Sequence, residues 1–320
     1  MALTLVEASK IAMGKDQVML ATIMELYARG SDITANLPFD SIGGAAEVFL
    51  REKLLPNVGF RKINAGYTEG TGKTDRITEN LAIAGGDLDV DKFLVDTGGD
   101  NQRSIQEAMK IKALSLNIAK TVIKGSTITT PESFDGLQER MGTTTSDTCI
   151  KNTATAATCG ALHLIRLDQL IDAVEDPTHL IMNKQMRRRL TVAARTAGVG
   201  GYITYDVDAF GRRVTKYNDL PILIADKDET NSDILPFEEL GGCSAAGAGG
   251  LGYCTSIYCV SMQEDGLVGL QNGPMDVRDL GEIESKPVYR TRIEWYITIS
   301  IRRPYAVARL SNISDLAVTP

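Results

Sequence analysis

The chain has 320 residues, of which 43% are hydrophobic and 23% are charged. This composition is typical of a folded globular protein and excludes a chain that is disordered throughout. The formal net charge is −7, which disfavours a dedicated nucleic-acid-binding domain unless its positive charge is confined to one face. Charged side chains interrupt every apolar stretch before it reaches the length of a membrane span, so we expect neither a membrane segment nor a signal peptide.

The few cysteines and histidines limit the chemistry that the chain can perform. The number of cysteines is odd and none are spaced Cys-x-x-Cys, a pattern that predicts reduced intracellular thiols. Neither His163 nor His179 has a cysteine or histidine at ligand spacing. The sequence therefore predicts no metal site, no cofactor and no catalytic residues. The cysteines are Cys149, Cys159, Cys243, Cys254 and Cys259.

The N-terminal quarter of the chain predicts an arm followed by a long hairpin. A weakly helical pattern before residue 30 ends at a Gly-Ser-Asp interruption, which is more typical of an arm than of a domain. Two extended apolar runs, 48–54 and 77–84, flank a turn-rich segment at 64–75. An isolated two-stranded ribbon is marginal in water, so we expect this hairpin to lie on another surface, most simply on a neighbouring subunit.

Residues 103–124 contain neither Gly nor Pro, and Gly125 follows them, which predicts a helix of about 33 Å. Its apolar residues fall on two nearly opposite stripes, so we expect it to be covered on two sides. A polar sector between the stripes contains no acidic residue of the helix, and it fits either an ordinary solvated face or a strip facing a polyanion. The sector comprises Arg103, Gln106, Lys110, Asn117, Lys120 and Lys124.

The second half of the chain predicts a mixed α+β unit and then a long strand. Apolar spacing indicates helices near 167–174 and 186–197, with a short strand at 180–182 between them. Residues 289–302 alternate strictly between apolar and polar side chains, which predicts one long strand with one buried face. We expect Pro304 to end this strand and residues 306–310 to return beside it.

Three segments imitate known motifs without meeting their requirements. The glycines at 66 and 72 before Lys73 are one residue too far apart for a phosphate-binding loop, and the residues that follow predict a strand, so a hairpin tip is the better interpretation. The glycine-rich stretch at 247–252 has no preceding strand. The acidic triplet at 87–91 lacks the glycine and glutamate of a calcium loop. For the three consecutive arginines at 187–189, a solvated or inter-subunit role is the default.

The order of these elements resembles that of the major capsid proteins of tailed bacteriophages, which have the Hong Kong 97-type fold that encapsulin shells share. The matching motifs run in order through the chain, with the middle glycine-rich stretch the least recognisable. They lie at residues 1–8, 37–39, 55–61, 65–69, 85–91, 134–137 and 180–183.

This resemblance implies an α+β fold with an N-terminal arm, an extended loop, a peripheral domain and an axial domain. It implies a structural function: self-assembly as hexamers and pentamers into an icosahedral head around double-stranded DNA, in the virion after assembly in the host cytoplasm. An encapsulin-like nanocompartment shell is the alternative. The expected segments are 1–45 for the arm, 46–86 for the hairpin, 87–150 with 286–320 for the peripheral domain, 101–125 for its spine helix, and 151–285 for the axial domain.

The resemblance also implies partners and site residues. The implied partners are a scaffolding protein, a portal protein, cement or decoration proteins in some relatives, and packaged DNA held by non-specific contacts, with no membrane. We expect the scaffolding protein to be a separate chain, since only about 45 residues precede the hairpin. Some relatives join a hairpin Lys to an Asn of a neighbour, but no motif singles out such a pair here. The predicted DNA-facing residues are Lys10, Lys15, Arg103, Lys110, Lys120 and Lys124. The predicted inter-subunit hairpin residues are Phe60, Arg61, Lys62, Tyr67, Glu69 and Lys73.

Overall fold

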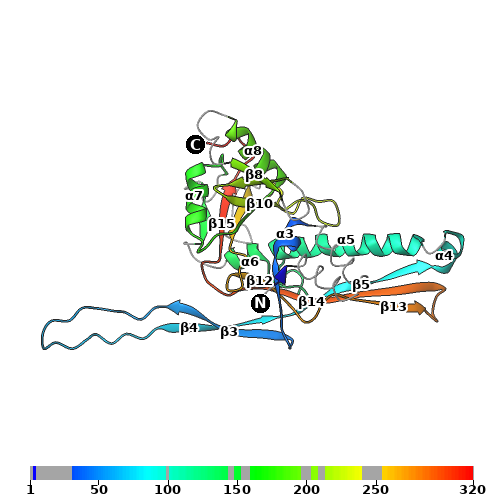
Figure 1. Ribbon diagram of the computed structural model, residues 1–320, viewed down its shortest axis with the longest axis horizontal. Coiled ribbons are helices and arrows are strands. Elements are labelled where there is room, and N and C mark those ends of the chain that lie inside the picture. Colours follow the sequence, from blue (N-terminus) through cyan, green and yellow to red (C-terminus); the bar gives the residue numbers. More distant parts are fainter. Residues whose placement is uncertain are drawn as a thin grey trace.

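The computed structural model describes residues 3–4, 31–98, 101–142, 148–152, 159–195, 203–207, 213–239 and 254–319. Two sheets, a separate two-stranded ribbon and one long helix dominate this part of the chain (Figure 1). Lys10, Lys15 and the glycine-rich stretch at 247–252 lie outside the described residues.

The first sheet has six strands and is organised around one long central strand. This strand, β14, pairs antiparallel with β5, β12 and β13, while β12 also pairs with β2, and β2 with β1. The predicted alternation is confirmed as far as Ile297, with Ile293, Trp295 and Ile297 buried on one face, but Thr298 and Ser300 on the opposite face are buried too. The strands are β1 (Leu3–Thr4), β2 (Pro38–Ser41), β5 (Ala82–Asp91), β12 (Leu267–Gln271), β13 (Asp276–Glu282) and β14 (Val288–Ile301).

The absence of Gly and Pro correctly predicted the long helix α5 (Asn101–Lys124). This helix packs along the first sheet. Its buried side carries Ile111, Ile118 and Val122 into the core beside β14. Gly125 follows the last residue of the helix. Only glycine fits at this position, because a Cβ there would collide with the carbonyl oxygen of Phe134. Shorter helices flank it: α3 (Asp32–Asn36), α4 (Lys92–Gly98) and α6 (Leu137–Gly142).

The expectation that α5 is covered on two sides is wrong for its N-terminal half. Ile105 and Met109, which belong to the second apolar stripe, are 45% and 60% exposed. The stripe becomes buried only near the C-terminal end, at Ile123. The reason is that the sheet lies on one side of α5, and that its other side is covered only where the C-terminal end of the helix reaches the rest of the molecule (Figure 1). No helix among the described residues is long and apolar enough to cross a membrane.

The second sheet has seven strands in the order β6-β15-β11-β7-β10-β9-β8, with two helices packed on it. Asn183 fixes the start of α8, since its Oδ1 accepts a hydrogen bond from the Met186 N–H at 2.7 Å. The elements are β6 (Cys149–Lys151), α7 (Leu164–Asp172), β7 (His179–Met182), α8 (Lys184–Ala194), β8 (Ile203–Val207), β9 (Arg213–Tyr217), β10 (Leu220–Ile224), β11 (Thr255–Val260) and β15 (Val307–Ile313).

Two expectations about the C-terminal half need correction. Strand β15 does not return beside β14 but joins the second sheet, where it pairs with β11 and β6. Strands β12 and β13, which fall within the predicted axial segment 151–285, pair with β14 in the first sheet instead. The sheet membership therefore does not follow the predicted boundaries at 151 and 286. Alternation shows which face of a strand is buried, but it does not identify the strand's neighbours.

The predicted hairpin is present as a separate two-stranded ribbon, but it ends at Asn80, because residues 82–86 of the predicted segment 46–86 belong to β5 in the first sheet. Its strands, β3 (Ala46–Leu54) and β4 (Lys73–Asn80), pair antiparallel from Ala46↔Asn80 to Leu54↔Lys73. The ribbon projects far from both sheets, with its tip at one end of the molecule (Figure 1). Lys73 therefore begins a strand, which excludes the phosphate-binding-loop interpretation for this segment, since that loop must open a helix.

Candidate functional site: the extended hairpin and the polar face of the long helix

The tip of the hairpin presents large apolar side chains to solvent. All residues from 52 to 74 are exposed, and among them Val58, Phe60 and Ile63 are 89%, 111% and 92% exposed. Contiguous apolar exposure of this kind is rare on a soluble monomer and is typical of a surface that another molecule covers. The hairpin tip is therefore the strongest candidate for a protein contact in the described part of the chain.

The six predicted hairpin residues all lie on this exposed ribbon, and the structure brings two of them together. The guanidinium of Arg61 lies 5.1 Å from the centroid of the Tyr67 ring, a cation–π arrangement. Nη1 of Arg61 also donates to the Ala65 carbonyl oxygen at 3.4 Å. The other four predicted residues are exposed and form no cation–π contact or hydrogen bond with one another: Phe60, Lys62, Glu69 and Lys73. The role of all six in a subunit contact remains a prediction.

The base of the hairpin is held by two arginines that the sequence did not single out. Arg140 forms a bidentate pair with Glu79 at 2.5 and 2.8 Å and also donates to the Ile299 carbonyl oxygen. Arg302 contacts Glu47 and Asp40, both at 2.8 Å. These pairs join β4 and β3 to the first sheet, so the base of the ribbon is fixed while its tip makes no contact with the core. The partners are 61 and 255 residues apart in the chain, and no local pattern could reveal them.

The polar sector of α5 is neutralised by acidic residues from other elements. Nη2 of Arg103 lies 2.5 Å from Asp279 on β13, and this hydrogen bond lowers the pKa of the Asp279 carboxyl. Nζ of Lys120 lies 2.9 Å from Asp228, whose side chain is only 4% exposed. The predicted absence of acid holds for the six sector positions, but Glu107 on the same helix lies 3.3 Å from Nε of Arg103. Tertiary structure supplies the other carboxylates, which a single-helix pattern cannot show.

The remaining predicted lysines of the sector are also partly enclosed. Burial lowers the pKa of Lys124, against the opposing charges of Glu239 and Glu238. Lys110 lies over the backbone of β5, because a Cβ added at Gly86 would be 3.0 Å from its Nζ. The structure thus places Arg103, Lys110, Lys120 and Lys124 on α5 as predicted, but it leaves their DNA-facing role a prediction.

The Lys120–Asp228 pair gives a pH-dependent prediction. Desolvation raises the pKa of Asp228, but hydrogen bonds from Lys120, Thr230 and the Ser232 N–H outweigh it and hold the pKa well below its usual value. A carboxyl with a lowered folded-state pKa stabilises the fold above its normal pKa and loses that contribution as pH falls below it. We expect Lys120→Met to cost about 1–3 kcal/mol at pH 7, and less below about pH 4, where Asp228 can be protonated in the variant.

Urea unfolding of the parent and of Lys120→Met at pH 7 and at pH 3.5 measures this difference. Lys112→Met is the control, because Lys112 is exposed on the same helix. An equal cost for Lys120→Met at both pH values would contradict the assignment of the effect to Asp228.

The acidic triplet at 87–91 forms ion pairs rather than a calcium loop. It lies in β5, where Asp87 pairs with Arg292 at 2.7 Å and Asp89 with Arg290 at 2.6 Å across the β5–β14 ladder. The hydrogen bond from Arg292 lowers the pKa of Asp87. Within the described ranges, no group of three or more His, Cys, Asp or Glu side chains could hold a metal ion.

The expectation of reduced thiols does not hold for three cysteines in the form of the chain that the structure describes. Cys159 and Cys254 form a disulfide with their Cα atoms 5.5 Å apart, and Cys149 is also disulfide-bonded. Cys259 is free and buried. Cys243 lies outside the described residues. The first pair is separated by 95 residues, so spacing along the chain could not reveal it.

Comparison with known proteins bears on this arrangement directly. The sequence profile of the family "Major capsid protein GP7" matches residues 15–172, which is about half of the chain. No curated protein sequence matches the chain.

Solved structures match nearly the whole fold. The SrpI encapsulin from Synechococcus elongatus PCC 7942 is 16% identical, with a TM-score of 0.59 over 89% of this chain and 88% of that one. A structure from Mycobacterium phage Bobi is 11% identical, with a TM-score of 0.58 over 91% of each chain. The capsid of a native GTA particle is 14% identical, with a TM-score of 0.57 over 89% of this chain and 91% of that one.

The chain has the α+β Hong Kong 97-type fold of phage capsids and encapsulins. Within that class, residues 15–172 are similar in sequence to the family "Major capsid protein GP7". Both statements confirm what the order of motifs in the sequence implied.

Proposed function

We propose that the chain is the major capsid protein of a tailed bacteriophage, which assembles as hexamers and pentamers into an icosahedral head around double-stranded DNA. The observation that carries the proposal is the hairpin, whose base is fixed to the first sheet while its exposed apolar tip packs on neither core of the described residues. Such a tip gains free energy only by covering another molecule, and a second copy of the chain offers the same surface at every position of a shell.

The proposal gives the chain a structural role without catalysis. Its partners would be further copies of itself, a separate scaffolding protein, a portal protein and packaged DNA. Its location would be the virion, after assembly in the host cytoplasm. The support is the family match together with the fold of the phage neighbours.

An encapsulin-like nanocompartment is the second candidate, and the SrpI encapsulin match favours it. The two functions differ in what the shell encloses. Particles purified from a co-expression with the neighbouring phage genes and treated with nuclease separate them. Protected double-stranded DNA inside the particles supports the phage head, whereas empty particles that retain one co-purifying protein support the nanocompartment.

The polar face of α5 gives a prediction about DNA retention. We expect the combined substitution of Lys110, Lys120 and Lys124 by Gln to leave shell assembly intact and to lower the DNA retained, with the largest difference from the parent at low salt. The physical reason is that lysine contacts to phosphates release counterions, so their strength falls with salt concentration. Lys112→Gln, on the exposed surface of the same helix, is the matched control.

Quantifying nuclease-protected DNA per particle at two salt concentrations measures the effect. Because Lys120 also pairs with Asp228, the variant's thermal unfolding is compared with that of the parent to confirm that it folds. If the triple variant retains DNA like the parent, the sector is an ordinary solvated face.

A further inference from the structure

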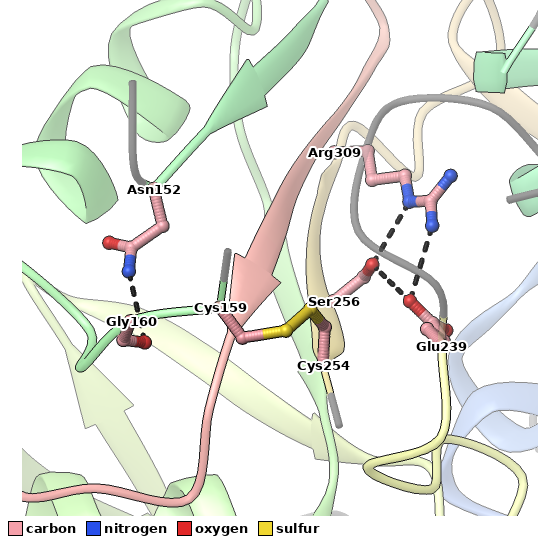
Figure 2. The surroundings of a disulfide bond; sticks show 7 residues. All are labelled: Asn152, Cys159, Gly160, Glu239, Cys254, Ser256 and Arg309. Atoms are coloured by element: carbon pink, nitrogen blue, oxygen red, sulfur yellow. Dashed lines mark hydrogen bonds and ion pairs between the residues drawn. A yellow bond between two sulfur atoms is a disulfide. The ribbon is translucent and has the colours of Figure 1, made fainter. Parts of the chain in front are cut away.

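The Cys159–Cys254 disulfide lies where three segments of the second sheet meet. Gly160 and Thr255, the residues next to the two cysteines, both pair with Ile313 at the end of β15. The N–H of Gly160 donates to Asn312 at 3.1 Å, and Asn152 Nδ2 donates to the Gly160 carbonyl oxygen at 3.2 Å. The bond therefore joins the two segments that flank the end of the last strand (Figure 2).

A buried polar network lies against the Cys254 side of the bond. Cys254 exchanges backbone hydrogen bonds with Glu239 at 2.9 and 3.2 Å. The Glu239 carboxylate accepts from Ser256 at 2.5 Å and from Arg309 at 3.2 Å, and Figure 2 shows these groups beside the disulfide. Closing the bond therefore restrains the strand segment that carries this network.

The two sulfur atoms differ in their access to solvent. Cys254 is 1% exposed, whereas Cys159 is only partly buried. A reagent in solution would therefore meet Cys159 first. Cys259 provides a contrast, because burial raises the pKa of its thiol to about 12 and keeps it protonated and unreactive.

We propose that Cys159 and Cys254 are an oxidative modification site that stays as two thiols during folding and assembly and closes after release into an oxidising medium. This timing rests on the proposed function, since cytoplasmic assembly is what would keep the thiols reduced. The oxidant class is a low-molecular-weight disulfide, such as oxidised glutathione.

The exchange proceeds in two balanced steps. The Cys159 thiolate attacks the small disulfide, forms a mixed disulfide and releases one small thiolate. The Cys254 thiolate then attacks the Cys159 sulfur and releases the second small thiolate. Two protein thiols lose two protons and two electrons, and one small disulfide becomes two thiols. A closed loop of this length restrains the unfolded chain, so we expect oxidation to raise the thermal unfolding midpoint by about 5–10 °C.

The test begins with cells alkylated before lysis, followed by particles purified reduced and then treated with oxidised glutathione. We expect peptide mapping to find alkylated Cys159 and Cys254 in the cells and a Cys159–Cys254 linked peptide after treatment. We expect limited alkylation of reduced particles to label Cys159 at least about tenfold faster than Cys254.

Three variants separate this bond from the other cysteines. Cys159→Ser and Cys254→Ser should lose the linked peptide and most of the midpoint gain, while Cys259→Ser should keep both. Because Cys149 is also disulfide-bonded, the gain is taken as the difference between parent and variant under identical treatment.

Three results would each overturn the proposal. The first is a Cys159–Cys254 linked peptide already present in alkylated cells, and the second is the absence of that peptide after oxidation. The third is a gain in the thermal unfolding midpoint that is unchanged in both Cys159→Ser and Cys254→Ser. Shell formation is scored separately by electron microscopy. Closed shells from Cys159→Ser would leave the proposed function standing whatever happens to the bond.

Discussion

Deleting residues 64–75 is expected to abolish shell formation and to leave soluble capsomers or monomers. These residues lie in the exposed tip region and the start of β4, and none of them contributes to either core. Under the proposed function, assembly gains free energy from burying side chains such as Phe60 and Ile63 against another subunit, at about 1.5–3 kcal/mol for each one fully buried. Removing the turn disrupts the ribbon that presents them.

Size-exclusion chromatography with light scattering measures the assembly state of the deletion variant. Its fold is checked by thermal unfolding, which should match that of unassembled parent subunits because both cores are untouched. A finer pair of variants separates apolar burial from the loss of the loop: Phe60→Ser with Ile63→Ser should also impair assembly, whereas Glu52→Gln on the same ribbon should not. Normal shells from the deletion would show that the hairpin is dispensable.

Arg309→Met is expected to destabilise the fold by about 3–5 kcal/mol, the largest effect of a single substitution that we predict. Arg309 is 1% exposed and its charge faces the Glu239 carboxylate, which is 5% exposed. Removing the guanidinium leaves a buried negative charge without its partner, and the methionine cannot donate to Ser256, to which Arg309 Nε donates at 3.0 Å.

A double variant decides whether charge or packing causes the loss. Arg309→Met combined with Glu239→Gln removes both charges, so we expect it to regain a large part of the stability. Chemical denaturation of unassembled subunits gives the free energies of unfolding for the parent, both single variants and the double variant. A cost below about 1 kcal/mol for Arg309→Met, or no recovery in the double variant, would contradict a pair held together by its charges.

The elements with regular local patterns could be predicted from the sequence. The alternation in 289–302 predicted β14, and the long stretch without Gly or Pro predicted α5, because both patterns arise within one element. The two runs around 64–75 likewise predicted the hairpin. The structure leaves its tip exposed, and the expectation that it lies on another subunit stays a prediction.

Features that depend on distant pairing could not be predicted in this way. The sequence indicated a strand after Pro304 but not the sheet that it joins. The chain turns at Arg303–Tyr305 into the second sheet rather than back along β14. The α5 sector contains only positive charges along the helix, yet Asp279 and Asp228 reach it from other elements. The Cys159–Cys254 pair and the arginines at the base of the hairpin depend on the same long-range arrangement.

Electron microscopy of the purified 320-residue chain, expressed with and without the scaffolding protein that the proposed function implies, decides whether the chain builds a shell. We expect closed shells of uniform size when such a protein is present, with hexamers and pentamers resolved in class averages and the ribbon at 46–80 lying over an adjacent subunit. A chain that stays monomeric under both conditions at high concentration, or shells in which that ribbon touches no neighbouring subunit, would contradict the proposed function.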